Sequence, residues 1–392
     1  MISKNMRRAD DRLPRLIWVV NHKTLLPAEV PILRSLGYAV YVPKRVPNVP
    51  EYRSAVVEYS YDADLKIPDD VLAILNFHRF YEREWSPTLT SILNKYFDVL
   101  VSSVSVFTTP LFEAIRKFKG GVVARVFGRE NPARYTSFFE MSGDMTLLDG
   151  VKAMGNRFVF GQGFDNLAEI EDLCLSQRAR TVTVSVPEFV WERRGSWKGG
   201  EKKVLLLCPN IRDSKYYGGI YSELKAIFKD VPHAIFGPQN IPPGDPVVLP
   251  YMTDAELLDL YRRMCVFAYP SIEPRHVHYS PIEAMIVGTP VLYRSGGMLD
   301  HLAGQRLPGC CDSKEEVREN ALRLLSGDIR LEVAIRESQE KIIEKFSTDS
   351  TNRVGGGSRA MLLEVGCNPV DLKWFVQYSG PWVFRFVGAP AY

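Results

Sequence analysis

The sequence has little cysteine and no long hydrophobic run. Six cysteines occur among 392 residues, and none forms a C-x-x-C pair. Neither a disulfide framework nor a zinc finger is therefore indicated, and a reducing cytoplasm is expected. No stretch approaches the roughly 18 consecutive apolar residues of a transmembrane helix. The apolar run near the N-terminus covers only residues 16–20. A signal peptide needs about 7–15 such residues, so no secretory signal is expected.

The chain also lacks an excess of charge of one sign. Lys and Arg number 49 and Asp and Glu number 46, which gives a net charge of +3. A dedicated nucleic-acid binder should carry a clear basic excess, so no nucleic-acid partner is expected. The hydrophobic fraction of 46% and the charged fraction of 24% are those of a soluble globular protein. The length predicts about two to three domains.

Short apolar runs alternate with helical patterns, and this alternation occurs twice. Strands are expected at residues 15–20, 38–44, 72–78, 98–104, 121–128 and 157–161, and again at 203–210, 233–237, 265–271 and 289–294. An acidic helix is expected over residues 164–177. Such alternation indicates βαβ units and parallel sheets covered on both faces. The polar, basic stretch 192–203 between the two halves predicts an exposed linker.

We therefore predict an α/β protein with two Rossmann-like, doubly wound domains facing a cleft. The domains are expected at residues 1–192 and 203–346, with a linker at 193–202 and a C-terminal segment at 347–392. Ligands of such sheets bind outside the carboxyl ends of the strands. Neither half carries a G-x-G-x-x-G or P-loop motif after its first strand, which disfavours a simple NAD dehydrogenase and a P-loop enzyme.

Residues 249–297 carry the most specific pattern. Their matches to one family agree in order and spacing, and are Tyr251, Thr253, Asp254, Tyr261, Pro281, Glu283, Ala284, Met285, Gly288, Thr289 and Pro290. The segment resembles the nucleotide-binding half of GT-B glycosyltransferases, in particular the retaining family GT4. This resemblance implies the GT-B fold, with the C-terminal segment crossing back to pack on the N-terminal domain.

The run SPIEAM within this segment predicts a helix that opens at the cleft. Ser280 is its expected N-cap and Pro281 its first helical residue, followed by Ile282. A helix N-terminus attracts phosphate through its free N–H groups and its dipole. The resemblance implies that the Glu283 carboxylate accepts hydrogen bonds from a ribose diol. The alternative is that Glu283 only complements the helix dipole.

One position departs from the family pattern. Eight residues before Glu283 the family has a second glutamate, and here that position is Arg275, followed by His276 and His278. A cation and imidazoles suggest an anionic group on the donor, such as a CMP-linked 2-keto sugar acid bound through an Arg–carboxylate fork. A hexose nucleotide whose phosphates are held by Arg275 is an equally open alternative. Glu273 replaces the missing family glutamate only if the loop has a different conformation from that of the family. We place Arg275 and His278 among the catalytic candidates.

Other candidates depend partly on the resemblance. Asn210, Arg212 and Lys215 fall where the family clamps a diphosphate, although they also suit a solvated loop. Residues 237–240 and Tyr251 are expected around the base. The first-domain candidates follow predicted strands or precede a predicted helix, and are Asn21, His22, His78, Arg129, Glu130 and Gln162. Glu130 is the candidate catalytic carboxylate, while a salt-bridged loop and a structural histidine are the alternatives. His276 and His278 form at most a metal pair, without a third ligand nearby, so no metal is expected.

The predicted function is transfer of a sugar from a nucleotide sugar to a glycan or lipid-linked acceptor, with retention of configuration, in cell-surface polysaccharide synthesis. The nucleotide sugar is a substrate, and no cofactor is expected. The aromatic residues beyond position 373 are expected to dock on the first domain or to make peripheral membrane contact. A sugar-acid transferase, a non-catalytic glycan- or nucleotide-binding GT-B domain and a sugar epimerase are the alternatives.

Overall fold

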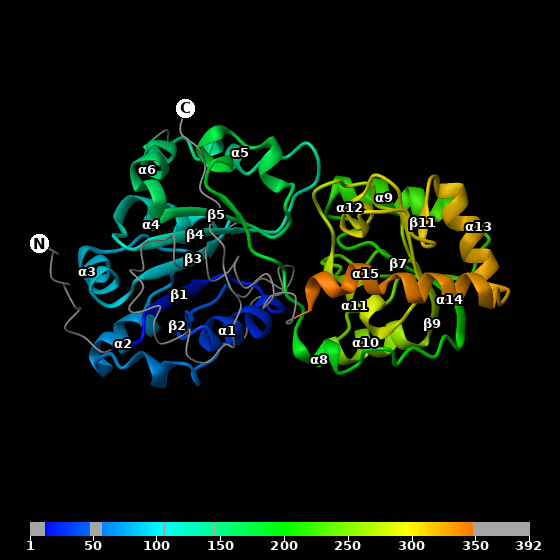
Figure 1. Ribbon diagram of the computed structural model, residues 1–392, viewed down its shortest axis with the longest axis horizontal. Helices are drawn as coiled ribbons and strands as arrows, with labels where there is room; N and C mark the ends of the chain where they lie inside the picture. The colour runs from blue at the N-terminus through cyan, green and yellow to red at the C-terminus, as the bar shows by residue number, and fades with distance from the viewer. Residues whose placement is uncertain (1–11, 48–56, 105–106, 145, 348–392) are drawn as a thin grey trace, which may run out of the picture.

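The computed structural model describes residues 12–47, 57–104, 107–144 and 146–347, which form two parallel β-sheets side by side (Figure 1). The first sheet has the strand order β2-β1-β3-β4-β5-β6 and the second has β11-β10-β9-β7-β8. The first-sheet strands are β1 (Arg15–Val19), β2 (Ala39–Tyr41), β3 (Val99–Ser103), β4 (Gly121–Val126), β5 (Phe158–Gln162) and β6 (Ala179–Thr181). Those of the second are β7 (Glu201–Leu207), β8 (His233–Phe236), β9 (Met264–Tyr269), β10 (Val291–Arg294) and β11 (Cys310–Cys311). The prediction of two Rossmann-like units is confirmed.

The helices of the first unit flank its sheet (Figure 1). They are α1 (Leu25–Ser35), α2 (Asp69–Phe77), α3 (Pro87–Tyr96), α4 (Thr109–Lys117), α5 (Thr136–Met141), α6 (Thr146–Met154) and α7 (Leu173–Ser176). The short helix α8 (Glu188–Trp191) follows them and packs against α11 (Tyr279–Val287) of the second unit. The strand predicted at residues 72–78 is wrong, because this segment belongs to α2. Asp69 and Asp70 occupy the first turn after Pro68, which favours a helix start. A short apolar run alone does not distinguish a strand from a helix.

The acidic helix predicted over residues 164–177 is also interrupted. A 3-10 turn (Leu167–Ile170) is followed by α7, and Glu171 and Asp172 between them have extended backbone. The buried Glu171 carboxylate accepts hydrogen bonds from the N–H groups of Tyr135 and Thr136, both at 2.7 Å. These bonds satisfy a buried charge, and they favour the chain break over a continuous helix.

The second unit has helices on both faces of its sheet. They are α9 (Lys215–Ile227), α10 (Asp254–Arg263), α11 (Tyr279–Val287), α12 (Met298–Ala303), α13 (Lys314–Leu325), α14 (Ile329–Ser338) and α15 (Glu340–Ile343). Thr253 and Glu256 form a capping box at the start of α10. Gly288, with a φ of +99°, ends α11 in the left-handed conformation that glycine adopts without strain. This end of α11 agrees with its sequence pattern.

Residues 192–203 are less free than their composition predicts. Much of this stretch is exposed, but the N–H groups of Gly195 and Trp197 donate to the carbonyls of Ile286 and Val287 at 3.0 Å. The Trp197 indole N–H donates to the Met264 carbonyl at 2.8 Å. The stretch is therefore anchored to the second unit.

Buried hydrophobic side chains hold α11 in place. A large cluster extends from the first sheet to the α10–α12 face of the second sheet, and a smaller one lies beneath α9 and α13. All side chains of residues 280–287 in α11 are buried. Close packing of this kind fixes the direction in which the first turn of α11 points.

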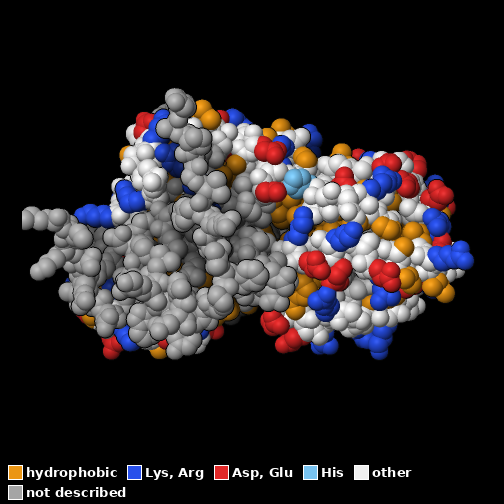
Figure 2. Space-filling model, viewed as in Figure 1, with side chains coloured by type: hydrophobic (Ala, Val, Ile, Leu, Met, Phe, Trp, Pro, Cys, Tyr) orange, Lys and Arg blue, Asp and Glu red, His pale blue; other side chains and the backbone are white. Residues whose placement is uncertain are grey.

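The surface and the chain end complete the description. Within the described residues no helix is both long and apolar enough to cross a membrane. Figure 2 shows Lys and Arg interspersed with Asp and Glu over the described part of the second unit. The predicted crossover of the C-terminal segment falls on residues 348–392, which lie outside the described residues, so it stays a prediction.

Candidate functional site

The two units meet through a set of polar contacts. Lys23 in the loop after β1 forms an ion pair with Asp254 at 2.8 Å. The Asn166 side-chain amide donates to the Pro274 carbonyl at 2.9 Å, and His301 lies 2.7 Å from Asp165. These contacts lie where loops that follow strands of one sheet face those of the other, which is where ligands of such sheets bind.

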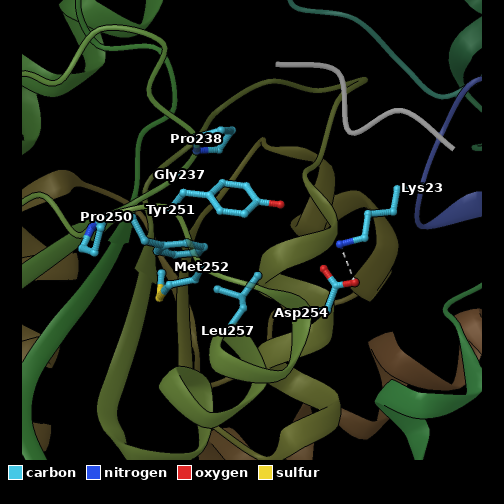
Figure 3. A pocket seen from close by; sticks show the side chains of 9 residues that line it. Lys23, Gly237, Pro238, Pro250, Tyr251, Met252, Asp254 and Leu257 are labelled. Atoms are coloured by element: carbon cyan, nitrogen blue, oxygen red, sulfur yellow. Dashed lines mark ion pairs between the residues drawn. The ribbon is translucent and has the colours of Figure 1, made fainter. Parts of the chain in front are cut away.

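A hollow lies on the second unit beside this boundary (Figure 3). Its lining residues are Lys23, Phe236, Gly237, Pro238, Pro250, Tyr251, Met252, Asp254 and Leu257. The Tyr251 side chain is 69% exposed at its mouth. Lys23 enters from the other unit and reaches Asp254 (Figure 3). The residues expected around the base, Gly237, Pro238 and Tyr251, thus share one largely apolar hollow, which suits a flat aromatic ring.

The first turn of α11 begins two residues earlier than predicted. Its N-cap is His278, so Tyr279 is the first helical residue and Ser280 and Pro281 are the second and third. The prediction that Ser280 is the N-cap is wrong. The hydroxyl of Tyr269 lies 2.9 Å from Nδ1 of His278 and accepts a hydrogen bond from its backbone N–H. These contacts hold residue 278 extended, and the helix starts directly after it.

Glu283 lies one turn into α11, next to Ile282, and both side chains are buried. Its carboxylate is 6% exposed and accepts a hydrogen bond from the Tyr261 hydroxyl at 3.2 Å. Tyr261 and Leu257 are four residues apart on α10 and so share one face of that helix. Glu283 thus contacts α10 one turn away from Leu257, which lines the hollow.

The N-termini of α9 and α11 meet at a side-chain contact. The Tyr217 hydroxyl in the first turn of α9 lies 3.1 Å from Nε2 of His278, the N-cap of α11. Lys215 is the first residue of α9 and its side chain is exposed. Two helix N-termini and a lysine together provide a positive field that attracts an anion.

The other diphosphate candidates differ in their surroundings. Arg212 is exposed and donates to the Pro242 carbonyl at 3.4 Å. Asn210 has a left-handed backbone with a φ of +47°, and its N–H donates to the Pro238 carbonyl. Its Oδ1 atom is buried and has no hydrogen-bond partner among the described residues. Asn210 is therefore a turn residue with one unused acceptor.

A cluster of tyrosines and histidines surrounds the α9–α11 contact. The rings of His276 and His278 lie 4.8 Å apart. Burial, together with the nearby charges of Glu273 and Glu130, raises the pKa of Tyr269 to about 12. Burial also lowers the pKa of His276, against the opposing influence of Glu130 and Glu273. Burial thus favours the neutral forms of Tyr269 and His276, while the Glu130 carboxylate acts on both from the first unit.

Arg275 does not point into the second unit as the sugar-acid prediction requires. Its guanidinium lies 3.3 Å from the Glu169 carboxylate and donates from Nε to the Asn166 carbonyl, also at 3.3 Å. Both partners belong to the first unit. Arg275 thus joins the two units in this arrangement.

The first-unit candidates divide into two groups. The His22 ring lies 5.9 Å from the Tyr279 ring across the boundary, and Asn21 precedes it in the same loop. Arg129 stacks over Phe138 at 4.2 Å, directly before Glu130. Asn21, His22 and Glu130 thus lie toward the boundary, whereas the guanidinium of Arg129 is packed within the first unit.

The local structure predicted around two first-unit candidates is wrong, while their roles on the acceptor side stay predictions. His78 follows the last residue of α2 rather than ending a strand, and α2 lies on the side of the first unit away from the second sheet (Figure 1). Gln162 ends β5 without a helix directly after it. Its side chain bonds to the Asp165 carbonyl, Thr181 Oγ1 and the Ala168 N–H, at 3.2, 3.2 and 2.9 Å. These bonds give Gln162 a structural role in its loop.

Sequence reasoning missed Lys23 and Tyr217 as site residues. Lys23 stands in the loop after the first strand, which carries no glycine-rich motif, and its charge after a buried strand was the available signal. Tyr217 lies two residues after Lys215, but nothing in the sequence indicates its contact with His278. Among the described residues, no group of three or more His, Cys, Asp or Glu side chains is arranged to hold a metal ion.

Comparison with known proteins places the fold. No family model matches the sequence, and no curated protein matches it. A glycosyltransferase from Rickettsia africae is similar in structure, with a TM-score of 0.57 and 13% identity over 92% of this chain and 100% of that one. Sucrose-phosphate synthase from Thermosynechococcus elongatus has a TM-score of 0.56 and 14% identity over 88% and 99% of the two chains. A UDP-forming α,α-trehalose-phosphate synthase from Burkholderia xenovorans has a TM-score of 0.54 and 11% identity over 89% and 99%. The chain therefore has the two-domain GT-B fold of these glycosyltransferases.

Proposed function

We propose that this protein is a glycosyltransferase that moves a sugar from a nucleotide sugar to a glycan or lipid-linked acceptor. The observation that carries the proposal is the meeting of the α9 and α11 N-termini on the same unit as the hollow that Tyr251 and Gly237 line. A ring-binding hollow and an anion-attracting site on one unit match the base and phosphates of a nucleotide.

Each part of the donor has a counterpart in this arrangement. The base occupies the hollow, and the ribose hydroxyls donate to the Glu283 carboxylate. The diphosphate lies at the two helix N-termini with Lys215. As the bond from the sugar to the diphosphate breaks, negative charge grows on the leaving oxygen, and fixed dipoles and cations lower the energy of this charge. The sugar then faces the first unit, from which Glu130 and His22 approach.

The similar structures support this assignment through their own names. The Burkholderia protein is named as UDP-forming, and the Anabaena protein HepE, with a TM-score of 0.52 and 10% identity over 88% of this chain and 99% of that one, is in complex with UDP. Retention of configuration, metal-free catalysis and membership of GT4 rest on the motif at residues 249–297. A role in cell-surface polysaccharide synthesis at the cytoplasmic face of the membrane rests on the same resemblance.

The sugar-acid alternative loses its main argument. It depended on Arg275 meeting the carboxylate of the donor, and the Arg275 guanidinium instead contacts Glu169 and Asn166. We therefore favour a donor whose sugar is neutral.

A nucleotide panel tests the proposal. Thermal unfolding is followed with UDP, GDP, ADP, dTDP and CMP, and hydrolysis of the corresponding nucleotide sugars is then measured. A ligand that binds only the folded state at 100 times its Kd adds about 2.7 kcal/mol to the free energy of unfolding. Stabilisation by one nucleoside diphosphate with release of sugar supports the proposal. Binding without turnover of any sugar points to a non-catalytic domain, and no stabilisation contradicts the proposed function.

The role of Glu283 is tested by removing the ribose 2′-hydroxyl. If its carboxylate binds the diol, E283Q weakens binding of the nucleotide by roughly tenfold, since bonds to charged groups contribute about 1.5–3 kcal/mol. The 2′-deoxynucleotide then loses much less affinity on the same substitution. Glu256, which caps the neighbouring helix α10, provides the matched control E256Q. If E283Q weakens binding of both nucleotides equally, Glu283 does not bind the ribose 2′-hydroxyl and only complements the helix dipole.

A further inference from the structure

Two charged side chains border the hollow that is proposed to hold the base. Lys23 and Asp254 carry opposite charges, and the other residues that line the hollow are uncharged. Asp254 and Leu257 are three residues apart on α10, so both lie on the side of the helix that borders the hollow. Lys23 comes from the first unit, and its ammonium lies 2.8 Å from Oδ2 of Asp254 (Figure 3). The edge of an aromatic ring in the hollow therefore meets a carboxylate and an ammonium group.

The Asp254 carboxylate is not needed to cap its own helix. Thr253 Oγ1 accepts the Glu256 N–H at 3.3 Å, and the Glu256 carboxylate accepts the Thr253 N–H at 2.7 Å. These two residues complete the capping box of α10. Lys23 pairs with Oδ2 of Asp254, and Oδ1 accepts no hydrogen bond from the described residues. Asp254 thus has an acceptor oxygen to offer at the hollow.

The ion pair of Lys23 with Asp254 is weak enough for a ligand to share it. The two side chains are 30% and 46% exposed. Such a pair contributes little to the free energy of unfolding, because water already solvates both charges. An ammonium group has three N–H donors, and a carboxylate has two acceptor oxygens. A ligand can therefore bond to both groups while they remain paired.

A carboxylate beside an ammonium group distinguishes the bases by their hydrogen-bonding edges. Guanine presents the acceptor O6 and then two donors, the N1–H and the 2-amino group. The two donors fit the two oxygens of a carboxylate, and O6 fits the ammonium group. Uracil and thymine have one donor between two carbonyls, so one carboxylate oxygen faces a carbonyl oxygen. Adenine and cytosine have a ring nitrogen acceptor beside the amino group, so they too offer one donor only.

We infer that the hollow selects guanine, with the Asp254 carboxylate accepting from N1–H and the 2-amino group and Lys23 donating to O6. The donor is then a sugar linked to GDP. The inference rests on the proposed function and names the nucleotide of its donor. Because Lys23 and Asp254 belong to different units, the base is held by both units. Both residues determine specificity, and they bind the end of the donor that is remote from the sugar.

A panel of nucleotides tests this selectivity. Calorimetry measures the Kd values of GDP, UDP, ADP, CDP and dTDP, and of IDP, whose base lacks only the 2-amino group of guanine. Wild type should bind GDP roughly tenfold more tightly than the other five, because hydrogen bonds to charged groups are the stronger ones. Binding of UDP or another of the five as tight as that of GDP contradicts the inference.

D254N separates recognition of the base from a general role of Asp254 in α10. Asparagine has one oxygen and one NH2 group, so a donor of the side chain now meets a donor of guanine. The Kd of GDP should rise roughly tenfold, to about that of IDP, while the Kd of UDP should not rise. D259N, at an exposed aspartate of the same helix, is the matched control and should keep the preference for GDP. Equal losses for GDP and UDP in D254N contradict the inference.

K23M tests the contribution of the first unit. Loss of the ammonium group leaves O6 without its donor, so K23M should weaken binding of GDP about fivefold. IDP also carries O6 and should lose the same factor, so the ratio of the two Kd values should stay as in wild type. K152M, at an exposed lysine elsewhere in the first unit, is the control. If K23M binds GDP as tightly as wild type does, Lys23 does not contact the base and that part of the inference is wrong.

The outcomes distinguish this inference from the proposed function. If wild type binds none of the nucleoside diphosphates, the proposed function fails. If wild type binds one of them but does not prefer GDP, only the inference about guanine fails. If D254N does not fold, as judged by circular dichroism, the ratio of the wild-type Kd values for IDP and GDP decides. A ratio near one contradicts recognition of the 2-amino group.

Discussion

The Glu273 carboxylate accepts a hydrogen bond from the backbone N–H of Asn131, at 2.7 Å and across 142 positions of sequence. Asn131 belongs to the loop after β4 of the first unit, and Glu273 to the loop after β9 of the second. The other Glu273 oxygen accepts the Tyr216 hydroxyl of α9. One side chain therefore links the first unit to the helix that carries the proposed phosphate site.

E273Q should loosen this link without unfolding the protein. The amide has one oxygen and one NH2 group, so one of the two donors now meets another donor. Because the carboxylate is only partly buried, we expect the melting temperature to change by about 2 °C or less, and kcat/KM for the nucleotide sugar to fall roughly fivefold. E337Q, at an exposed glutamate of α14, is the control. Unchanged kcat/KM in E273Q would show that the link has no role in turnover.

The loop after β4 also approaches the second unit through Gly128. Its φ is +94°, and a Cβ atom there would overlap the Arg275 carbonyl oxygen. Gly143 has a similar φ of +71°, and no described atom lies within 4 Å of the place of its Cβ. The two glycines therefore share a left-handed backbone conformation, but only Gly128 lies at a contact between the units.

G128A and G143A should separate these two effects. Both variants acquire the strain of an alanine at positive φ, about 1–2 kcal/mol. Only G128A must also push the two units apart, so kcat/KM should fall at least tenfold in G128A and remain near wild type in G143A. Small-angle scattering should show a larger radius of gyration for G128A alone. Equal kcat/KM in the two variants would mean that the contact between Gly128 and Arg275 can shift without an effect on turnover.

The sequence predicts the strands and turns around this site better than the contacts of its functional side chains. Strands such as 99–103 and 264–269 appear as continuous apolar runs because parallel sheets are buried on both faces. The end of α11 at Gly288 is also predictable from the sequence, because glycine adopts the left-handed backbone conformation without strain. The direction of Arg275 was not predictable, because Glu169 approaches it from another domain, 106 positions away in sequence. Partners that only the assembled fold brings together leave no local pattern in the sequence.

The same reasoning explains the error at the start of α11. Ser280 followed by Pro281 is a good local signal for an N-cap and a first helical residue. The contacts of His278 with Tyr269 and Tyr217 come from β9 and α9, and they move the helix start to Tyr279. Tertiary hydrogen bonds thus override a local capping preference.

R125M should destabilise the first unit strongly. The Arg125 side chain is 1% exposed and lies 2.8 Å from the Glu29 carboxylate, which also accepts the Trp18 indole N–H at 3.1 Å. Removal of the cation leaves a largely buried carboxylate without its partner, which reduces the free energy of unfolding by about 3–5 kcal/mol. Urea denaturation measures this loss. D149A breaks the exposed pair of Asp149 with Lys152 and should have no measurable effect. A small loss in R125M would mean that water reaches Glu29.

His78 should make the protein less stable in mild acid. Burial lowers the pKa of His78 below its usual value, against a hydrogen bond to the Arg83 backbone and the charge of Glu113. Between this lowered pKa and about 6.5, the unfolded chain therefore binds more protons than the folded one, so stability rises with pH in this window and levels off above it. H78Q removes this contribution, and its melting temperature should change less between pH 5 and pH 6.5 than that of wild type. The pKa of His276 is lowered as well, so the melting temperature of H78Q still depends on pH to some extent. F77L, at the exposed neighbouring residue, introduces no titrating group and should follow the wild-type slope with a constant offset. If the H78Q slope equals that of F77L, protonation of His78 does not contribute to acid sensitivity.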